Sequence, residues 1–265
     1  MNRIDHKFIQ LRSSGKKAFI AFLTAGDPDL AATEQLVLAF ERAGVDIVEI
    51  GVPFSDPLAD GPTIQAASYR SLQKGTTLAA ILELVTRIRR KSDIPLALMT
   101  YYNPVFNFGE EKFAVQAAAA GVDGIIIPDL PLEEAGPWRA FAAREGLATV
   151  FFLAPTTGPE RAAAVASAST GFIYFVSIAG ITGARQAVPS EIKAKISLAK
   201  TLTDKPLCVG FGVATPAQAH AMAQIADGVI VGSAIVKEIN INAKAKDLPQ
   251  RMQRFVAGLV RAVKR

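Results

Sequence analysis

The sequence has few of the residues that hold metal sites and disulfide-stabilised folds together. Its 265 residues include one cysteine, Cys208, so neither an internal disulfide nor a cluster of thiolate ligands can form. The two histidines, His6 and His220, are far apart, and neither lies in a serine-elbow or HExxH motif. We therefore expect no metal site, and we expect both histidines on the surfaces of helices.

Long apolar runs and one-sided charge are also missing. No stretch approaches the roughly 18 uninterrupted apolar residues that cross a bilayer, and the segment MNRIDHKFIQLRSSGKK lacks the apolar region of a signal peptide. The formal net charge of +5 comes from Lys and Arg interspersed with Asp and Glu, without interleaved aromatic residues. We therefore expect a cytoplasmic protein that binds neither a membrane nor nucleic acid.

The sequence instead alternates short apolar runs with helix-like segments, which is typical of parallel strands joined by helices. The predicted strands are residues 18–24, 45–51, 94–100, 124–128, 148–153, 172–176, 207–210 and 228–231. No Pro-rich or Ser-rich linker interrupts them. The pattern favours one α/β domain over residues 1–265, a single (β/α)₈ TIM barrel, over the alternative of a doubly wound open sheet. We also expect an extra N-terminal helix at 5–14, additional loop helices and a final amphipathic helix at 248–263.

One carboxylate lies within a predicted strand. In VDIVEIG, Glu49 shares strand parity with Val45 and Ile47, so its side chain points the same way as apolar neighbours. No Lys or Arg adjoins it in sequence. Burial would then raise the pKa of Glu49, which suits a general acid and base near neutral pH. The alternatives are a distant arginine partner or a place at the outer rim of the sheet.

The next segment, GVPFSDPLADGP at 51–62, is too rich in Pro, Gly and Asp for a plain connection to a helix. We expect a structured loop at the mouth of the barrel. Asp56, in Ser-Asp-Pro, fits a turn former. Asp60 is ambiguous, because it could cap a helix that begins near Thr63 or face the mouth as a second carboxylate.

Glycine-rich segments follow the last three predicted strands, at 179–183, 210–212 and 231–235. In a barrel these loops are neighbours, and glycines let backbone N–H groups approach an anion closely. Ser233 opens an apparent helix whose free amides and dipole favour a phosphate. The segments together favour a phosphate site over independent turns.

The segment EIGVPFSDPLADGPTIQ at 49–65 resembles the active-site signature of tryptophan synthase α subunits, and the resemblance covers nearly the whole chain. It includes FLTAGDP at 22–28, TYYNPVFNFG at 100–109, IIIPDLPLEE at 125–134 and LAPTT at 153–157. The resemblance implies retro-aldol cleavage of indole-3-glycerol phosphate to indole and D-glyceraldehyde 3-phosphate. In that family the positions of Glu49 and Asp60 are the catalytic pair.

The same resemblance assigns the remaining site residues. The implied phosphate-binding positions are Gly183, Gly212, Gly232 and Ser233. The implied pocket positions are Phe22, Tyr101, Ile126, Asp129, Tyr174, Thr182 and Phe211. Each pocket residue could instead be a simple packing residue. One departure is Ile178 in VSIAGITG, where the family usually has a polar residue, so the polar contacts of a lid at 180–189 are in question.

The resemblance also implies an α₂β₂ complex with a β subunit that carries pyridoxal phosphate, while this subunit needs no cofactor. The loops at 56–62 and 102–109 are long enough to contact such a partner. Alternatives are a free-standing indole-forming lyase, a non-catalytic regulator, or another phosphate-binding barrel enzyme. A Schiff-base aldolase would need a lysine at a strand end, and neither Lys205 nor Lys237 lies at the carboxyl end of a predicted strand.

Overall fold

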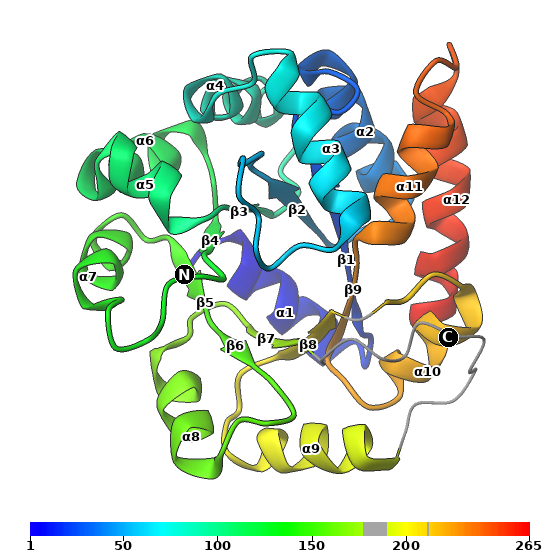
Figure 1. The fold of residues 1–265 in the computed structure, drawn as a ribbon. Helices are drawn as coiled ribbons and strands as arrows, with labels where there is room; N and C mark the ends of the chain where they lie inside the picture. Colours follow the sequence, from blue (N-terminus) through cyan, green and yellow to red (C-terminus); the bar gives the residue numbers. More distant parts are fainter. Residues whose placement is uncertain (177–189, 211) are drawn as a thin grey trace.

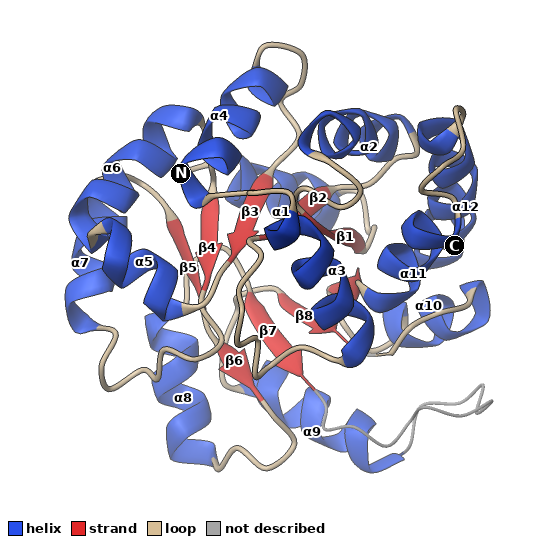
Figure 2. Cartoon of the chain, turned by 45° about the horizontal axis from the view of Figure 1, so that its top comes forward, coloured by secondary structure: helices blue, strands red, loops and turns tan. Residues whose placement is uncertain are grey.

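The chain folds into a barrel of parallel strands surrounded by helices (Figures 1 and 2). The structure, a computed structural model, describes residues 1–176, 190–210 and 212–265. The strands are β1 (Ala18–Thr24), β2 (Ile47–Gly51), β3 (Leu96–Met99), β4 (Gly124–Ile126), β5 (Ala148–Val150), β6 (Phe152–Leu153), β7 (Ile173–Val176), β8 (Leu207–Gly210) and β9 (Gly228–Val231). Their order in the sheet is β5-β4-β3-β2-β1-β9-β8-β7-β6.

The two ends of this sheet are pieces of one predicted strand, 148–153. β5 pairs with β4 while β6 pairs with β7, and only Phe151 separates β5 from β6 in sequence. The ring of strands is therefore continuous through this segment. The predicted (β/α)₈ barrel is confirmed, with one of its eight strands divided, and the doubly wound open sheet is wrong.

The helices form the outer layer, and several begin where the sequence indicates. They are α1 (Arg3–Ser13), α2 (Leu30–Arg42), α3 (Pro62–Gln73), α4 (Leu78–Arg89), α5 (Tyr102–Phe108), α6 (Glu110–Ala120), α7 (Gly136–Arg144), α8 (Pro159–Ala168), α9 (Ser190–Thr201), α10 (Pro216–Ala223), α11 (Ser233–Ile241) and α12 (Leu248–Val263). Asp29 caps α2 by accepting the Ala32 N–H, and Thr215 forms a capping box with Gln218 at α10. None of the described helices is both long and apolar enough to cross a membrane.

Helix α1 closes the amino-terminal end of the barrel. Ile4, Phe8 and Leu11 pack into the same buried cluster as residues inside the barrel, such as Ala18 and Phe172. His6 lies exposed on α1, and His220 lies exposed on α10, as predicted. Within the described ranges, no group of three or more His, Cys, Asp or Glu side chains could hold a metal ion.

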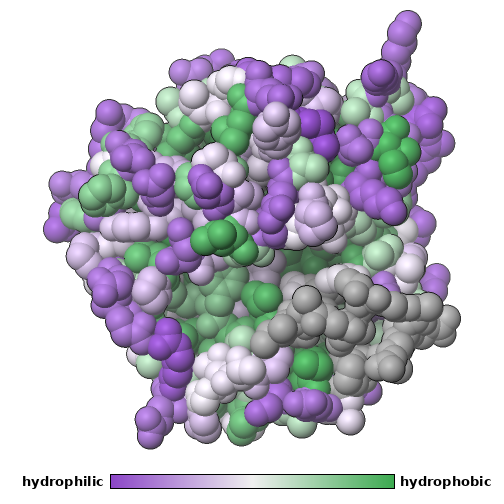
Figure 3. Space-filling model, viewed as in Figure 1, coloured by the Kyte–Doolittle hydropathy of each residue, from purple (hydrophilic) through white to green (hydrophobic). Residues whose placement is uncertain are grey.

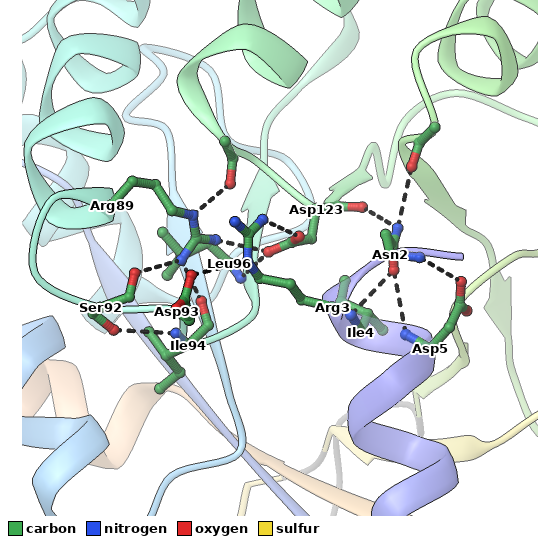
Figure 4. Close-up of polar contacts among 12 residues, drawn as sticks. Asn2, Arg3, Ile4, Asp5, Arg89, Ser92, Asp93, Ile94, Leu96 and Asp123 are labelled. Carbon is green, nitrogen blue, oxygen red and sulfur yellow. Dashed lines mark hydrogen bonds and ion pairs between the residues drawn. The ribbon is translucent and has the colours of Figure 1, made fainter.

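Buried aspartates tie the strands together at this end. The carboxylate of Asp46 accepts the Phe19 N–H at 2.8 Å, and that of Asp123 accepts the Leu96 N–H at 2.9 Å. Asp123 also receives Arg3 at 3.1 Å and Arg89 at 2.7 Å, which joins α1 and α4 to the barrel (Figure 4). The amino-terminal end therefore serves stability, which leaves the carboxyl end for a site.

Candidate active site

A cavity of about 330 Å³ lies at the carboxyl end of the strands, and the alternation of side chains along the strands explains its lining. Ile20, Ile47, Ala97, Ile126, Val150, Cys208 and Ile230 fill the barrel interior. Two residues further along the same segments come Phe22, Glu49, Met99, Pro128, Phe152, Gly210 and Gly232, all of which line the cavity. The cavity is thus the next layer of the barrel. Hydrophobic side chains gather in a hollow at the centre of this face (Figure 3).

Glu49 lies in this layer, and no side chain in the described part of the chain forms an ion pair with it. It pairs in register with Phe22 of β1 and Ala97 of β3, and its side chain is 0% exposed. Among the described residues neither carboxylate oxygen has a hydrogen-bond partner. Burial, and then the charge of Asp60, raise the pKa of Glu49 to about 8. The expected rise in the pKa of Glu49 is confirmed. The alternative was an arginine partner, and no arginine among the described residues pairs with Glu49.

Asp60 lies opposite, on the loop between β2 and α3. Gly61 is the N-cap of α3, and no described side chain caps that helix, so the helix-capping interpretation of Asp60 is wrong. Its carboxylate lines the cavity instead, and burial raises the pKa of Asp60 to about 6. Asp56, by contrast, is exposed and accepts the hydroxyl of Ser55, as a turn former would.

Tyr101 anchors the loop that carries Asp60. It is 3% exposed, its ring stacks on Phe54 at 5.2 Å, and its hydroxyl accepts the Ala59 N–H at 3.0 Å. The same hydroxyl hydrogen-bonds the carboxyl of Asp60, which offsets part of the rise in the Asp60 pKa caused by burial. Tyr101 thus acts on Asp60 without lining the cavity.

Tyr174 forms the wall near Glu49. Its ring lies 5.0 Å from that of Phe152, and both line the cavity. Burial, and then the charge of Glu49, hold the pKa of Tyr174 well above its ordinary value, so its hydroxyl stays protonated. A side chain at Gly210 would overlap the Tyr174 ring, which is why only glycine fits there.

The cavity extends to the amino end of α11. Gly232 lines the cavity and is the N-cap of α11, and Ser233 is the first, exposed residue of the helix. No described side chain caps α11, so its first amides and its dipole are free for an anion. Gly212 follows β8 with a φ of +39° but is not in the lining. Thr182, Gly183 and Phe211, the lid at 180–189 and Ile178 lie outside the described residues.

Besides Tyr101, two further expected pocket residues do not line the cavity. Ile126 belongs to the barrel layer below, and Pro128, two residues later, occupies the lining. Asp129 accepts the Tyr102 N–H at 2.9 Å, so in this structure it holds the start of α5. Sequence reasoning missed Met99 and Phe152, although each follows an inward residue of its strand by two positions, the same signal that places Phe22 and Glu49.

Comparison with known proteins finds relatives over nearly the whole chain. The family model described as "Tryptophan synthase alpha chain" matches residues 8–264. The chain belongs to this family. The tryptophan synthase alpha chain of Geobacter sp. (strain M21) is 50% identical over 263 residues, which cover 99% of this chain and 98% of that relative.

Solved structures of the tryptophan synthase alpha family share the fold. The α subunit from Legionella pneumophila str. Paris superposes with a TM-score of 0.93 at 37% identity, covering 99% of this chain and 98% of that chain. A chain of ligand-free tryptophan synthase from M. tuberculosis gives a TM-score of 0.89 at 36% identity, with 99% of each chain covered. Family membership therefore rests on sequence and fold together.

Proposed function

We propose that this chain cleaves indole-3-glycerol phosphate to indole and D-glyceraldehyde 3-phosphate, as the α subunit reaction of tryptophan biosynthesis. The observation that carries the proposal is the placement of Glu49 and Asp60 on one apolar cavity, each with a raised pKa, beside the open amino end of α11. An apolar cavity suits an indole ring, and the helix end suits the phosphate.

The different pKa values of the two carboxyls give them different tasks. Near pH 7 Glu49 is protonated, so it can donate its proton to indole C3. Asp60 is ionised, so it can accept the indole N1–H and stabilise the positive charge that develops on the ring. As the carbon–carbon bond breaks, the Glu49 carboxylate takes the proton of the glycerol hydroxyl, which becomes the aldehyde. The cycle regenerates Glu49 and consumes no water.

The placement of the lysines supports this reaction over a Schiff-base aldolase. Lys205 donates to the carbonyls of Ala166 and Ser167, in the last turn of α8, at 2.7 and 3.2 Å, and Lys237 lies exposed on α11. No lysine of the described residues lines the cavity. Covalent aldol chemistry would need an amine there.

Release of indole from indole-3-glycerol phosphate tests the proposal. Purified chain should release indole and glyceraldehyde 3-phosphate in equal amounts, without added metal or pyridoxal phosphate. A chain that binds glycerol phosphate but releases no indole would contradict the lyase function. It would favour the alternative of another phosphate-binding barrel enzyme.

The activity should depend on pH through both carboxyls. We expect kcat/KM to rise as Asp60 loses its proton near pH 6 and to fall as Glu49 loses its proton near pH 8. Tyr101→Phe removes a hydrogen bond that lowers the Asp60 pKa, so the acid limb should move to higher pH while the basic limb stays. A pH–rate profile of both proteins checks this. Tyr102→Phe, at a half-buried tyrosine that does not line the cavity, serves as control. An unmoved acid limb in Tyr101→Phe contradicts the role given to Tyr101.

The mouth also supports a partner, which we propose is a β subunit that binds pyridoxal phosphate and consumes indole in an α₂β₂ complex in the cytoplasm. Leu58, on the loop that carries Asp60, is 91% exposed, and Phe106, on α5, is 63% exposed. Exposed apolar side chains at the open end of the barrel favour docking there. Contact with the Asp60 loop would let the partner tune cleavage, with reciprocal effects on binding.

Mixing with a cognate β subunit tests the partner. Sedimentation should show a larger species, and indole formation should accelerate. Leu58→Glu should weaken the complex, whereas Ile241→Glu, an exposed apolar residue at the end of α11, should not. Full activity of the chain alone, with no complex at micromolar concentrations, would favour a free-standing lyase.

A further inference from the structure

Helix α3 connects three parts of the site. It begins two residues after Asp60, and Ile64 in its first turns lines the cavity. One turn later Ala67 is fully buried in a cluster with Phe22 of β1 and Val236 of α11. A shift of α3 would therefore move the cavity wall and disturb its packing on the helix that begins at Ser233.

The position of Asp60 is tied directly to this helix. The side chain of Gln65 donates from Nε2 to the backbone oxygen of Asp60 at 2.9 Å. The Ile64 and Gln65 N–H groups both bond the Gly61 carbonyl at 3.0 Å. The segment from Asp60 to Gln65 is thus one hydrogen-bonded unit, so a movement of α3 would move Asp60 with it.

The other end of α3 is clamped onto the loop between β1 and α2. Arg70 makes a bidentate pair with Asp27, with Nε to Oδ1 at 2.9 Å and Nη2 to Oδ2 at 2.6 Å. Asp27 is 5% exposed, and this geometry is the strong form of an arginine–carboxylate interaction. Ser71 Oγ also donates to the Ala25 carbonyl at 2.5 Å. A side chain at Gly26 would overlap Ser71 and Thr76, so the loop and helix are in close contact.

We propose that Arg70 is a positioning residue for the cleavage reaction: its pair with Asp27 fixes α3, and α3 through Gln65 holds Asp60 over the cavity opposite Glu49. The proposal rests on the function proposed above. Arg70 does not line the cavity, and in the cleavage reaction it acts only through the helix. A misplacement of about 1 Å in a catalytic group can reduce a rate about 100-fold, so a clamp far from the chemistry can matter.

A matched ion pair allows a structural role to be separated from positioning. Arg87 of α4 donates from Nε to Glu34 of α2 at 3.2 Å, and this pair does not touch the cavity lining. Arg70→Met and Arg87→Met each remove one arginine that joins two segments of the outer layer. A general loss of stability would lower the melting temperature of both variants, whereas loss of positioning would change catalysis in one.

The experiment measures kcat, KM, the pH–rate profile and the melting temperature of Arg70→Met, Arg70→Lys, Asp27→Asn and Arg87→Met. In Arg70→Met and Asp27→Asn we expect kcat to fall about 10- to 100-fold, with a smaller change in KM because the α11 end remains. If Asp60 moves toward water, the burial that raises its pKa is lost, and the acid limb moves to lower pH. Arg70→Lys should recover part of kcat, and Arg87→Met should keep both kcat and the acid limb.

Unchanged kcat and an unmoved acid limb in folded Arg70→Met would overturn the proposal, and so would equal losses in Arg87→Met. Failure of the proposed function looks different, because the wild-type chain would then release no indole. In that case titration of the Asp60 carboxyl by ¹³C NMR in wild type and Arg70→Met still decides the positioning. A lowered Asp60 pKa in the variant supports it, and an unchanged one overturns it.

Discussion

Glu49→Gln is expected to lower kcat for indole release by about 10²- to 10⁴-fold, the range that a general acid–base group contributes. Gln keeps the size of the side chain in a layer where Glu49 is 0% exposed, but it cannot transfer a proton. Folding should be preserved. Steady-state indole release, with circular dichroism to check the fold, measures the effect.

The same substitution should change how stability depends on pH. The ordinary pKa of 4.5 applies to Glu49 in the unfolded chain, and the pKa in the folded chain is about 8. The stabilisation from a protonated Glu49 is therefore complete below about pH 4.5 and is lost as pH rises toward about 8. Glu49→Gln should lose less stability across this window. Glu145→Gln, at an exposed residue, is the control for this stability measurement. In the activity measurement, retention of more than about a tenth of the wild-type rate in Glu49→Gln contradicts the acid–base role.

Gly232→Asp should weaken the binding of glycerol phosphate by at least about tenfold, or about 1.4 kcal/mol. The new carboxylate would stand at the N-cap of α11, where it occupies the free amides and repels the phosphate dianion. Asp is a favourable N-cap residue, so the helix should not lose stability. Titration calorimetry with glycerol phosphate measures the affinity.

Gly232→Ala separates charge from bulk at the same position. An added Cβ there would meet Phe22 at 3.4 Å, an ordinary contact distance, so Ala should bind glycerol phosphate much better than Asp does. Equal affinity of folded Gly232→Asp and wild type for glycerol phosphate would show that the phosphate does not bind at this end of the cavity.

Strand periodicity predicted the barrel and the direction of Glu49 because a strand buried on both faces is apolar throughout and its side chains alternate strictly. It could not predict that strand 148–153 divides at Phe151, since this depends on pairing with two different neighbours. The family resemblance, in turn, assigned the pocket residue of the fourth strand one layer too low, at Ile126 instead of Pro128. Assigning a residue to the correct layer of the barrel requires knowing how neighbouring strands are staggered, which the sequence does not show directly.

The loop residues were harder to predict for a similar reason. Asp60 suited both a helix cap and a site, and the alternatives separate only when Gly61 is seen as the N-cap of α3. The contact of Tyr101 with Ala59 and the pair of Arg70 with Asp27 join residues more than 40 positions apart in sequence, so no local pattern reveals them. Asp129 fitted the pocket by resemblance, yet its carboxylate bonds the Tyr102 N–H.

Cleavage in D₂O tests the central claim most directly, because protonation of indole C3 is the step that requires Glu49. Wild-type chain equilibrated in D₂O should convert indole-3-glycerol phosphate into glyceraldehyde 3-phosphate and an equal amount of indole carrying one deuterium at C3, as measured by mass spectrometry and NMR. Glu49→Gln should release almost none. Indole without deuterium at C3, or deuterated indole formed equally fast by Glu49→Gln, would contradict the account.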